Sequence, residues 1–357
     1  MSGISAKMLQ AAAGARDEGA TVAYVAASTA DRITSIDISD PSNLTQLDSF
    51  SNANLDVAYG VALDVTNQVA YVISLNTDSI TSIDISDPSN LSELDSYSSA
   101  TLDFPFDVAL DVTNQVAYVA AYDVDSITSI DISDPSNLSE LDSYSSANLA
   151  NTRSVVLDLI NQVAYAPSSS ADRITSIDIS DPSNLSELDS YSSANLDGAN
   201  SIALDLTNQV AYVGSFSADS ITSIDISDPS NLTELDSFTS ADLDFVEDIA
   251  LDLTNQVAYV ASRGTDSITS IDISDPSNLT QLDSYSSGNL DFVENIALDL
   301  INQVAYAVST RADSITSIDI SDPSNLTELD SFSNANLDSS RGVALNIPGP
   351  ASTNAYE

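Results

Sequence analysis

The chain has 357 residues, of which 43% are hydrophobic, so it is long enough to bury a sizeable core. It carries 54 acidic residues and 8 Lys and Arg, which gives a net charge of −46. Binding to nucleic-acid phosphates needs clustered basic residues, so a nucleic-acid-binding protein is excluded. Cysteine and histidine are absent, which excludes disulfides, thiolate nucleophiles and imidazole bases. No apolar run is long enough for a transmembrane helix, so no membrane insertion is expected.

Residues 1–19 form a leader whose composition differs from that of the rest of the chain. Its segment ISAKMLQAAA is rich in strong helix formers, but a helix of that length needs a partner surface. The leader therefore predicts a short N-terminal helix that anchors the chain to another protein through Ile4, Lys7, Met8 and Leu9. With its SAKML and AAAG letters it resembles the leaders of structural and fibre proteins of tailed phages, which implies a place in a virion.

A twelve-residue motif, ITSIDISDPSNL, recurs after the leader without a single change. Its seven copies are spaced by 47 residues and begin at Ile33, Ile80, Ile127, Ile174, Ile221, Ile268 and Ile315. Self-similarity at a fixed period of this length indicates a repeat architecture.

Each unit contains four segments with β-strand character. In residues 60–97 these are GVALDV, QVAYVI, SITSIDIS and LSELDSY, which are β-branched or alternate apolar with polar residues. TNQ joins the first two segments as a tight hairpin, in which Asn67 is expected to adopt a left-handed conformation. SDPSNL joins the last two segments, with Pro88 fixing the turn. Each unit is therefore predicted to be a small antiparallel sheet.

The two ends of the repeat region split one unit between them. The chain enters at Thr21–Ala27, a second strand, and leaves at Arg341–Ile347, a first strand. A stacked solenoid, the alternative, would need polar caps instead. We therefore predict an all-β, seven-bladed β-propeller with four antiparallel strands per 47-residue blade, in which the N-terminal strands pair with the C-terminal strand. Residues 20–347 form the propeller, 1–19 the helical leader and joint, and 348–357 a C-terminal tail.

The repeated motif also resembles a known family. Its DISDPSN core at Asp37–Asn43 is similar to the LVIVD repeat, although Leu44 replaces the usual final proline. The resemblance implies a propeller and says little about function, because family members serve varied roles. We interpret the invariance as a requirement for similar blades to nest; a ring of metal-binding aspartates is the alternative.

Two segments of each unit vary between copies, and an up-and-down strand order places both on the same face. They are residues 54–60 with their equivalents, and the connection between the second and third strands. Arginine and aromatic residues, which dominate binding hot spots, gather in or beside these segments. The predicted binding residues of this variable face are Arg32, Arg153, Arg173, Arg263, Arg311, Arg341, Tyr59, Phe104, Phe106, Tyr122, Phe216, Phe245 and Phe292. Alternatively, the arginines relieve crowding of aspartates and the phenylalanines plug gaps between blades.

Together these features favour a non-enzymatic virion structural protein of a tailed virus, such as a fibre or decoration protein. It would be assembled in the host cytoplasm, bind other virion proteins through its leader and bind a host-surface glycan or protein through the variable face. No catalytic residue, cofactor or metal is expected. The main alternative is a cell-surface or scaffold propeller of a salt-adapted microbe, because salt would screen the net charge of −46. A carboxylate- or calcium-dependent hydrolase is a further alternative, although nothing singles out two carboxylates among 54 acidic residues.

Overall fold

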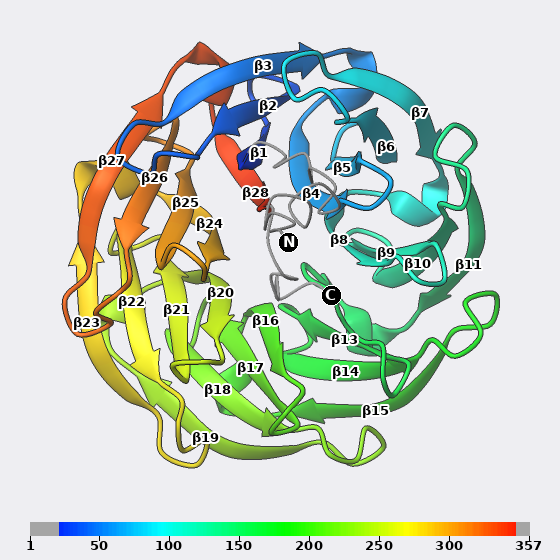
Figure 1. Ribbon diagram of the computed structural model, residues 1–357. Coiled ribbons are helices and arrows are strands. Elements are labelled where there is room, and N and C mark those ends of the chain that lie inside the picture. The colour runs from blue at the N-terminus through cyan, green and yellow to red at the C-terminus, as the bar shows by residue number, and fades with distance from the viewer. Residues whose placement is uncertain (1–20, 348–357) are drawn as a thin grey trace, which may run out of the picture.

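Seven four-stranded antiparallel sheets surround a central axis, so the predicted seven-bladed β-propeller is confirmed (Figure 1). The computed structural model describes residues 21–347. The predicted leader helix, its anchor residues and the tail at 348–357 lie outside these residues.

The strands of each blade run in order from the axis to the rim. The inner strands are β4 (Ala58–Asp64), β8 (Pro105–Asp111), β12 (Val156–Asp158), β16 (Ala199–Asp205), β20 (Val246–Asp252), β24 (Val293–Asp299) and β28 (Ser340–Asn346). The second strands are β1 (Val22–Ala27), β5 (Val69–Ser74), β9 (Val116–Ala121), β13 (Val163–Ser168), β17 (Val210–Ser215), β21 (Val257–Ser262) and β25 (Val304–Ser309). The third strands are β2 (Arg32–Asp37), β6 (Ser79–Asp84), β10 (Ser126–Asp131), β14 (Arg173–Asp178), β18 (Ser220–Asp225), β22 (Ser267–Asp272) and β26 (Ser314–Asp319). The outer strands are β3 (Thr45–Ser51), β7 (Ser92–Ser98), β11 (Ser139–Ser145), β15 (Ser186–Ser192), β19 (Thr233–Thr239), β23 (Thr280–Ser286) and β27 (Thr327–Ser333).

The ring is closed by strands from both ends of the chain. Strand β1 pairs with β28 on its inner side and with β2 on its outer side, with Val22 opposite both Asn346 and Asp37. The predicted pairing of the N-terminal strands with the C-terminal strand is therefore confirmed, and the solenoid is ruled out.

The hydrophobic core lies between blades. Each of seven clusters of buried residues joins two neighbouring sheets, as where Tyr71 and Ile73 pack with Val119 and Ile130. Burying one such side chain contributes about 1.5–3 kcal/mol, so the ring is stabilised mainly at its blade interfaces.

The invariant motif adds a polar link at the same interfaces. The hydroxyl of Ser82 donates to the carbonyl of Pro135 in the next blade at 2.6 Å, and the six equivalent serines do the same around the ring. Asp95 then accepts a hydrogen bond from the backbone of Leu138 in the next blade. The serine of each motif therefore bonds to the proline of the next copy, and the final leucine bonds to an aspartate of the preceding blade, which gives a physical reason for the invariance.

Many of the aspartates cap turns. Asp64 accepts from the backbone of Thr66 and Asn67 and from the Asn67 side chain, and its equivalents make the same bonds. The expected left-handed residue of this turn was wrongly assigned, because φ is +57° at Gln68 and Asn67 instead binds Asp64. Within residues 21–347 no group of acidic side chains is arranged to hold a metal ion.

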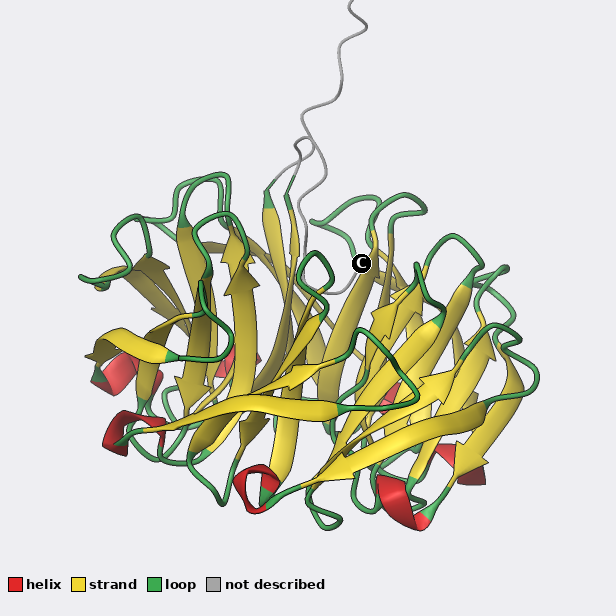
Figure 2. Ribbon diagram, turned by 90° about the horizontal axis from the view of Figure 1, so that it is seen from below, coloured by secondary structure: helices red, strands yellow, loops and turns green. Residues whose placement is uncertain are grey.

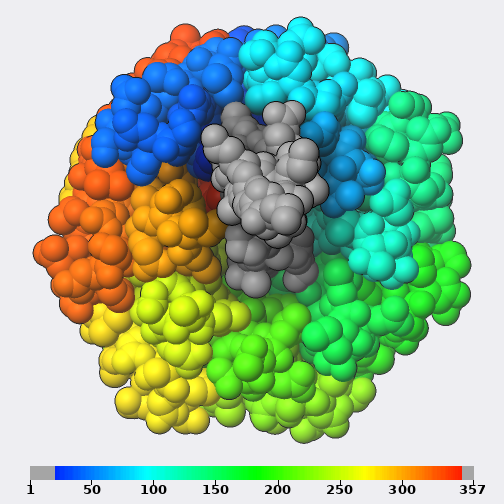
Figure 3. Space-filling model, in the orientation of Figure 1, coloured from blue at the N-terminus to red at the C-terminus, as the bar shows by residue number. Residues whose placement is uncertain are grey.

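The two faces of the disc differ. Seven single-turn 3₁₀ helices connect each outer strand to the next inner strand, and Figure 2 shows them along one face. They are η1 (Ala53–Leu55), η2 (Ala100–Leu102), η3 (Ala147–Leu149), η4 (Ala194–Leu196), η5 (Ala241–Leu243), η6 (Gly288–Leu290) and η7 (Ala335–Leu337). The loops between second and third strands contact this connection, as where Leu75 donates to Val57, so both variable segments share one face as predicted. Figure 3 shows the blades in contact around the opposite face. No described helix has the length and apolarity to cross a membrane.

Candidate functional site

The channel along the propeller axis carries a ring of seven side chains at its end on the variable face. Each lies at the start of an inner strand, or just before it in the case of Arg153, and successive members are 47 residues apart. This channel-mouth ring consists of Tyr59, Phe106, Arg153, Asn200, Glu247, Glu294 and Arg341. The seven equivalent positions thus carry five different residue types, whereas the motif that joins the blades is invariant.

A β-bulge places most of these residues in the ring. Pairing of β20 with β21 skips from Val246 to Asp248, so Glu247 is the extra residue, and Asn200, Glu294 and Arg341 occupy the same position in their blades. A bulge breaks the alternation of side chains and turns the extra residue toward a new direction. Here that direction is the channel.

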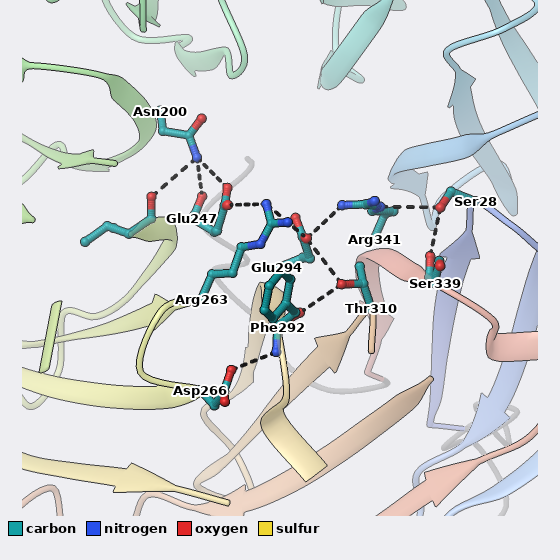
Figure 4. Close-up of polar contacts among 11 residues, drawn as sticks. Ser28, Asn200, Glu247, Arg263, Asp266, Phe292, Glu294, Thr310, Ser339 and Arg341 are labelled. Carbon is teal, nitrogen blue, oxygen red and sulfur yellow. Dashed lines mark hydrogen bonds and ion pairs between the residues drawn. The ribbon is translucent and has the colours of Figure 1, made fainter. Parts of the chain in front are cut away.

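In one half of the ring, Asn200, Glu247, Glu294 and Arg341 form a network with Arg263, which lies in the loop after β21 (Figure 4). Asn200 donates to Oε2 of Glu247 at 2.8 Å, while Nη1 of Arg263 lies 3.2 Å from the other oxygen of Glu247. The same nitrogen lies 3.8 Å from Glu294 Oε1, which Arg341 contacts at 2.7 Å. Both glutamate side chains are almost completely buried, at 4% and 3% exposed. This half therefore holds ionisable groups in a low-dielectric environment, where their interactions are strong.

The pKa values reflect this environment. Burial, and then the nearby charge of Glu294, raise the pKa of Glu247 well above that of an ordinary glutamate, although Arg153 and Arg263 oppose the rise. Burial also raises the pKa of the neighbouring Asp248 to about 7, despite its hydrogen bond from the backbone of Ile296. A carboxylate with a raised pKa can accept a proton at neutral pH and hold it, as a general base must.

The other half of the ring is aromatic. Tyr59 and Phe106 meet edge to face with ring centres 4.7 Å apart, and Phe106 lies 5.0 Å from Tyr122 and 6.0 Å from Phe104. The guanidinium of Arg153 lies over Phe106 at 4.8 Å and over Tyr122 at 5.4 Å. Such cation–π contacts hold a charged group at a fixed place on an apolar surface.

Two further aromatic contacts line the variable face beside the network. Phe292 is covered by Arg311 at 3.3 Å and by Arg263 at 4.4 Å, and Phe216 stacks on Phe245 with ring centres 4.4 Å apart. Phe104, Phe245 and Phe292 have φ near +57°, and the equivalent residues of the other four blades also have positive φ, so this left-handed turn is a feature of the repeat. An aspartate of the preceding blade fixes each of these turns, as Asp266 does by accepting from the Phe292 amide at 2.9 Å.

The predicted binding residues therefore fall into three groups. Arg153, Arg341, Tyr59 and Phe106 belong to the channel-mouth ring. Arg263 and Tyr122 contact members of the ring. Arg311, Phe104, Phe216, Phe245 and Phe292 lie in the adjoining loops. Arg32 and Arg173 do not join them. They hydrogen-bond to Asn336 and Asn148 at 2.6 Å and to serines of their own outer strands. No ligand identifies the binding residues, which stay predictions.

Sequence reasoning missed three members of the ring, Asn200, Glu247 and Glu294. Alignment of the units at their 47-residue spacing places all three in the position of Tyr59 and Arg341. The distribution of glutamate also points to two of them. Residues 21–347 contain seven glutamates, and five of these share one outer-strand position with Gln46 and Gln281. Glu247 and Glu294 are the two that lie elsewhere in the repeat. The repeat therefore sets these two carboxylates apart from the other glutamates.

Comparison with known proteins gives a family match over most of the chain. The family described as "Lactonase, 7-bladed beta-propeller" matches residues 20–336. No curated protein matches the sequence. Among solved structures, a protein of Lactobacillus plantarum superposes with a TM-score of 0.80 at 18% identity, covering 92% of this chain and 99% of that one. A Bacteroides uniformis protein provisionally assigned as a 6-phosphogluconolactonase gives 0.79 at 14% identity, with the same coverage. The periplasmic gluconolactonase PpgL of Pseudomonas aeruginosa gives 0.77 at 13%, again covering 92% and 99%. At these identities the three structures support the fold alone.

The family match corrects several expectations. The assignment to the LVIVD-repeat family is wrong, because a lactonase family matches instead, although the propeller that it implied is present. The non-enzymatic virion or fibre protein, and with it the phage-like interpretation of the leader, is contradicted by the same match. The carboxylate-dependent hydrolase, given as a further alternative, agrees better with the family. The expected virion partners, host surface and location are not tested by any described residue.

Proposed function

Because the chain belongs to the seven-bladed β-propeller lactonase family, we propose that it hydrolyses a lactone at the channel mouth. The observation that carries the proposal is the buried Glu247, held by Asn200 and Arg263 and facing two further charged groups, Glu294 and Arg341. The cavity that it lines has a volume of about 200 Å³, which suits a small molecule. The gluconolactonase among the structural neighbours supports a sugar-acid lactone as the substrate class.

Hydrolysis of a lactone needs a base for water and a donor for the carbonyl oxygen. In the proposed reaction Glu247 takes a proton from a water molecule as its oxygen attacks the carbonyl carbon. Burial and Glu294 raise the pKa of Glu247, so it accepts this proton more readily than an ordinary glutamate does. The ester C–O bond then breaks, the ring oxygen receives the proton back from Glu247, and the product is the open hydroxy acid.

The arginines stabilise the charge that develops on the carbonyl oxygen. Arg263 and Arg341 are fixed by their contacts with the two glutamates, and Arg341 is also held by Ser28 through Nε at 3.3 Å. Thr310 supports Glu294 from the adjoining loop at 3.4 Å. Donors that are fixed before the reaction stabilise an oxyanion without having to reorganise, and such stabilisation often contributes more to catalysis than any other single effect.

The proposal is tested by assaying a panel of γ- and δ-lactones, starting with D-glucono-δ-lactone, and following acid release above the spontaneous rate. Replacing Glu247 by Gln keeps the shape but removes the base, so kcat should fall by roughly 10²–10⁴-fold. Glu140→Gln is a matched control, because Glu140 lies on outer strand β11 and accepts from Tyr97 and Thr101. No hydrolysis by the wild-type protein, or a Glu247→Gln variant as active as the control, would refute the proposal.

A further inference from the structure

We infer that a polar pocket between the 3₁₀ helix η5 and the strands β22 and β23 binds a guanidinium group. Two other blades hold the guanidinium of one of the chain's own arginines at the equivalent place. Strands β22 and β23 are the third and outer strands of their blade, so the pocket lies away from the central channel. The inference is therefore independent of the proposed lactone hydrolysis.

Arg32 and Arg173 show how a blade holds a guanidinium at this place. Each is the first residue of a third strand. Nε of Arg173 donates to the carbonyl of Ala171 at 3.1 Å. Its Nη1 donates to Oδ1 of Asn148 at 2.6 Å and to Oγ of Ser190 at 3.1 Å. The equivalent bonds of Arg32 go to the same kinds of acceptor, in Ala30, Asn336 and Ser49.

In the blade of β22 a serine replaces this arginine. Ser267 begins the strand at the position of Arg173, and a pocket of about 350 Å³ lies beside it. The residues that correspond by repeat spacing to the three acceptors, Thr265, Asp242 and Ser284, all line the pocket. The fold therefore gathers a set of guanidinium acceptors around a space that no side chain of this blade fills.

Asp242 gives this pocket a charge that the equivalent positions lack. Its equivalents are all neutral, namely Asn54, Thr101, Asn148, Asn195, Asn289 and Asn336. In another blade Asn195 donates from its amide to the outer-strand carboxylate of Glu234 at 2.6 Å. Here the polarity is reversed, because Nε2 of Gln281 donates to Oδ2 of Asp242 at 2.7 Å. The carboxylate therefore lies where the guanidinium of Arg173 finds its acceptor, and within residues 21–347 its other oxygen has no hydrogen-bond partner.

The class of ligand follows from these groups. The carbonyl of Thr265, the hydroxyl of Ser284 and the carboxylate of Asp242 all accept hydrogen bonds. Asp283 lines the same pocket and adds a second negative charge, although the backbone of Leu326 donates to one of its oxygens. A guanidinium offers several N–H donors in one plane, and its bond to a carboxylate is charge-assisted. The ligand is therefore a guanidinium, either of a free small molecule or of an arginine side chain on another protein.

The test titrates the protein with N-methylguanidinium, N-acetyl-arginine amide and tetramethylammonium while NMR follows the backbone amide signals of Asp242 and of residues 265–267. A NaCl concentration of about 0.3 M screens the net charge of −46. We expect the two guanidinium compounds to bind saturably and tetramethylammonium, which has no N–H donor, not to bind. Asp242→Asn introduces the residue that five blades carry, and it should weaken guanidinium binding by roughly 5- to 30-fold through loss of a charge-assisted hydrogen bond. Asp123→Asn, which removes an exposed charge in another blade, is the control and should leave the affinity unchanged.

A second pair of variants fills the pocket with the chain's own side chain. Ser267→Arg introduces the residue that Arg173 is in its blade, and it should abolish binding of N-methylguanidinium. Ser220→Arg makes the same change beside the neutral Asn195 and should leave that binding intact. Arginine is native at this position in two blades, so both variants are expected to fold.

Three results would overturn the inference: no saturable binding, an unchanged affinity in Asp242→Asn, or binding that persists in a Ser267→Arg variant of native thermal stability. The two guanidinium compounds distinguish the source of the ligand, and both outcomes support the site. Tighter binding of N-acetyl-arginine amide indicates an arginine of a protein partner, whereas equal or weaker binding indicates a free guanidinium compound. Neither outcome depends on whether a lactone is hydrolysed.

Discussion

Replacing Glu294 by Gln should move the acid limb of the pH–activity profile to lower pH. Nη1 of Arg263 lies 3.2 Å from a Glu247 oxygen and 3.8 Å from a Glu294 oxygen, so these two oxygens are no more than ~7 Å apart. Like charges at that separation repel by about 2 kcal/mol at an effective dielectric constant of about 20. Both side chains are at least 96% buried, so solvent screens this repulsion little. The glutamine removes a negative charge that raises the pKa of Glu247, and the pKa of Glu247 should therefore fall by roughly 1–2 units.

The sign of this effect distinguishes the proposed roles of the two glutamates. Glu247 must be ionised to take a proton from water, so a lower pKa keeps the variant active at a pH where the wild-type protein has lost activity. The maximal rate should fall at the same time, because a weaker base remains and Arg341 loses its 2.7 Å partner. The assay is kcat/KM for D-glucono-δ-lactone between pH 4 and 8, with Glu140→Gln as the control. An acid limb that stays in place or moves to higher pH would show that Glu294 does not set the pKa of the base.

Two further predictions concern stability. Ser82→Ala should lower the free energy of unfolding by about 1–3 kcal/mol, because it leaves the Pro135 carbonyl and the Asp95 amide without their partner; an unchanged denaturation midpoint would contradict this role for the invariant motif. The melting temperature should rise by several degrees from low salt to molar KCl, because the Debye length falls from about 10 Å at 0.1 M to about 3 Å at 1 M and the net charge of −46 is then screened. A flat response in a scanning calorimeter would indicate that the aspartates are engaged locally in turns instead of repelling one another.

The fold could be predicted because the same pattern of strand and turn residues occurs in seven successive units of the sequence. The 47-residue spacing, the four β-rich segments and the split unit at 21–27 and 341–347 each point to a closed ring, and the pairing of β1 with β28 completes it. The 3₁₀ helices were not predicted. Each is a single turn that ends in a buried leucine such as Leu55 and begins at an Asn or Ser cap, and a three-residue segment has too little periodicity to identify.

The candidate site was predicted only in part, because residue type alone does not say which way a side chain points. Arg173 and Arg153 both lie in variable segments, yet Arg173 starts a third strand and bonds to Asn148, whereas Arg153 lies in the channel. The difference depends on the strand that each residue precedes or begins: Arg153 precedes the inner strand β12, whereas Arg173 begins β14, the third strand from the axis. Glu247 was overlooked for another reason: it is one of 54 acidic residues, and the sequence marks it only by its place in the repeat, away from the outer-strand position that five other glutamates share.

The symmetry of the scaffold explains why residue types differ at the bulged positions. A serine such as Ser82 and a proline such as Pro135 bond across every blade interface, so a change at either weakens contacts on two sheets at once. A bulged residue is the extra member of its strand pair and faces the channel, so substitution there leaves the ladder intact. Seven nearly identical blades can therefore present a tyrosine, a phenylalanine, an asparagine, two glutamates and two arginines at equivalent positions without altering the ring. The channel mouth is asymmetric because it is the place where asymmetry costs the fold least.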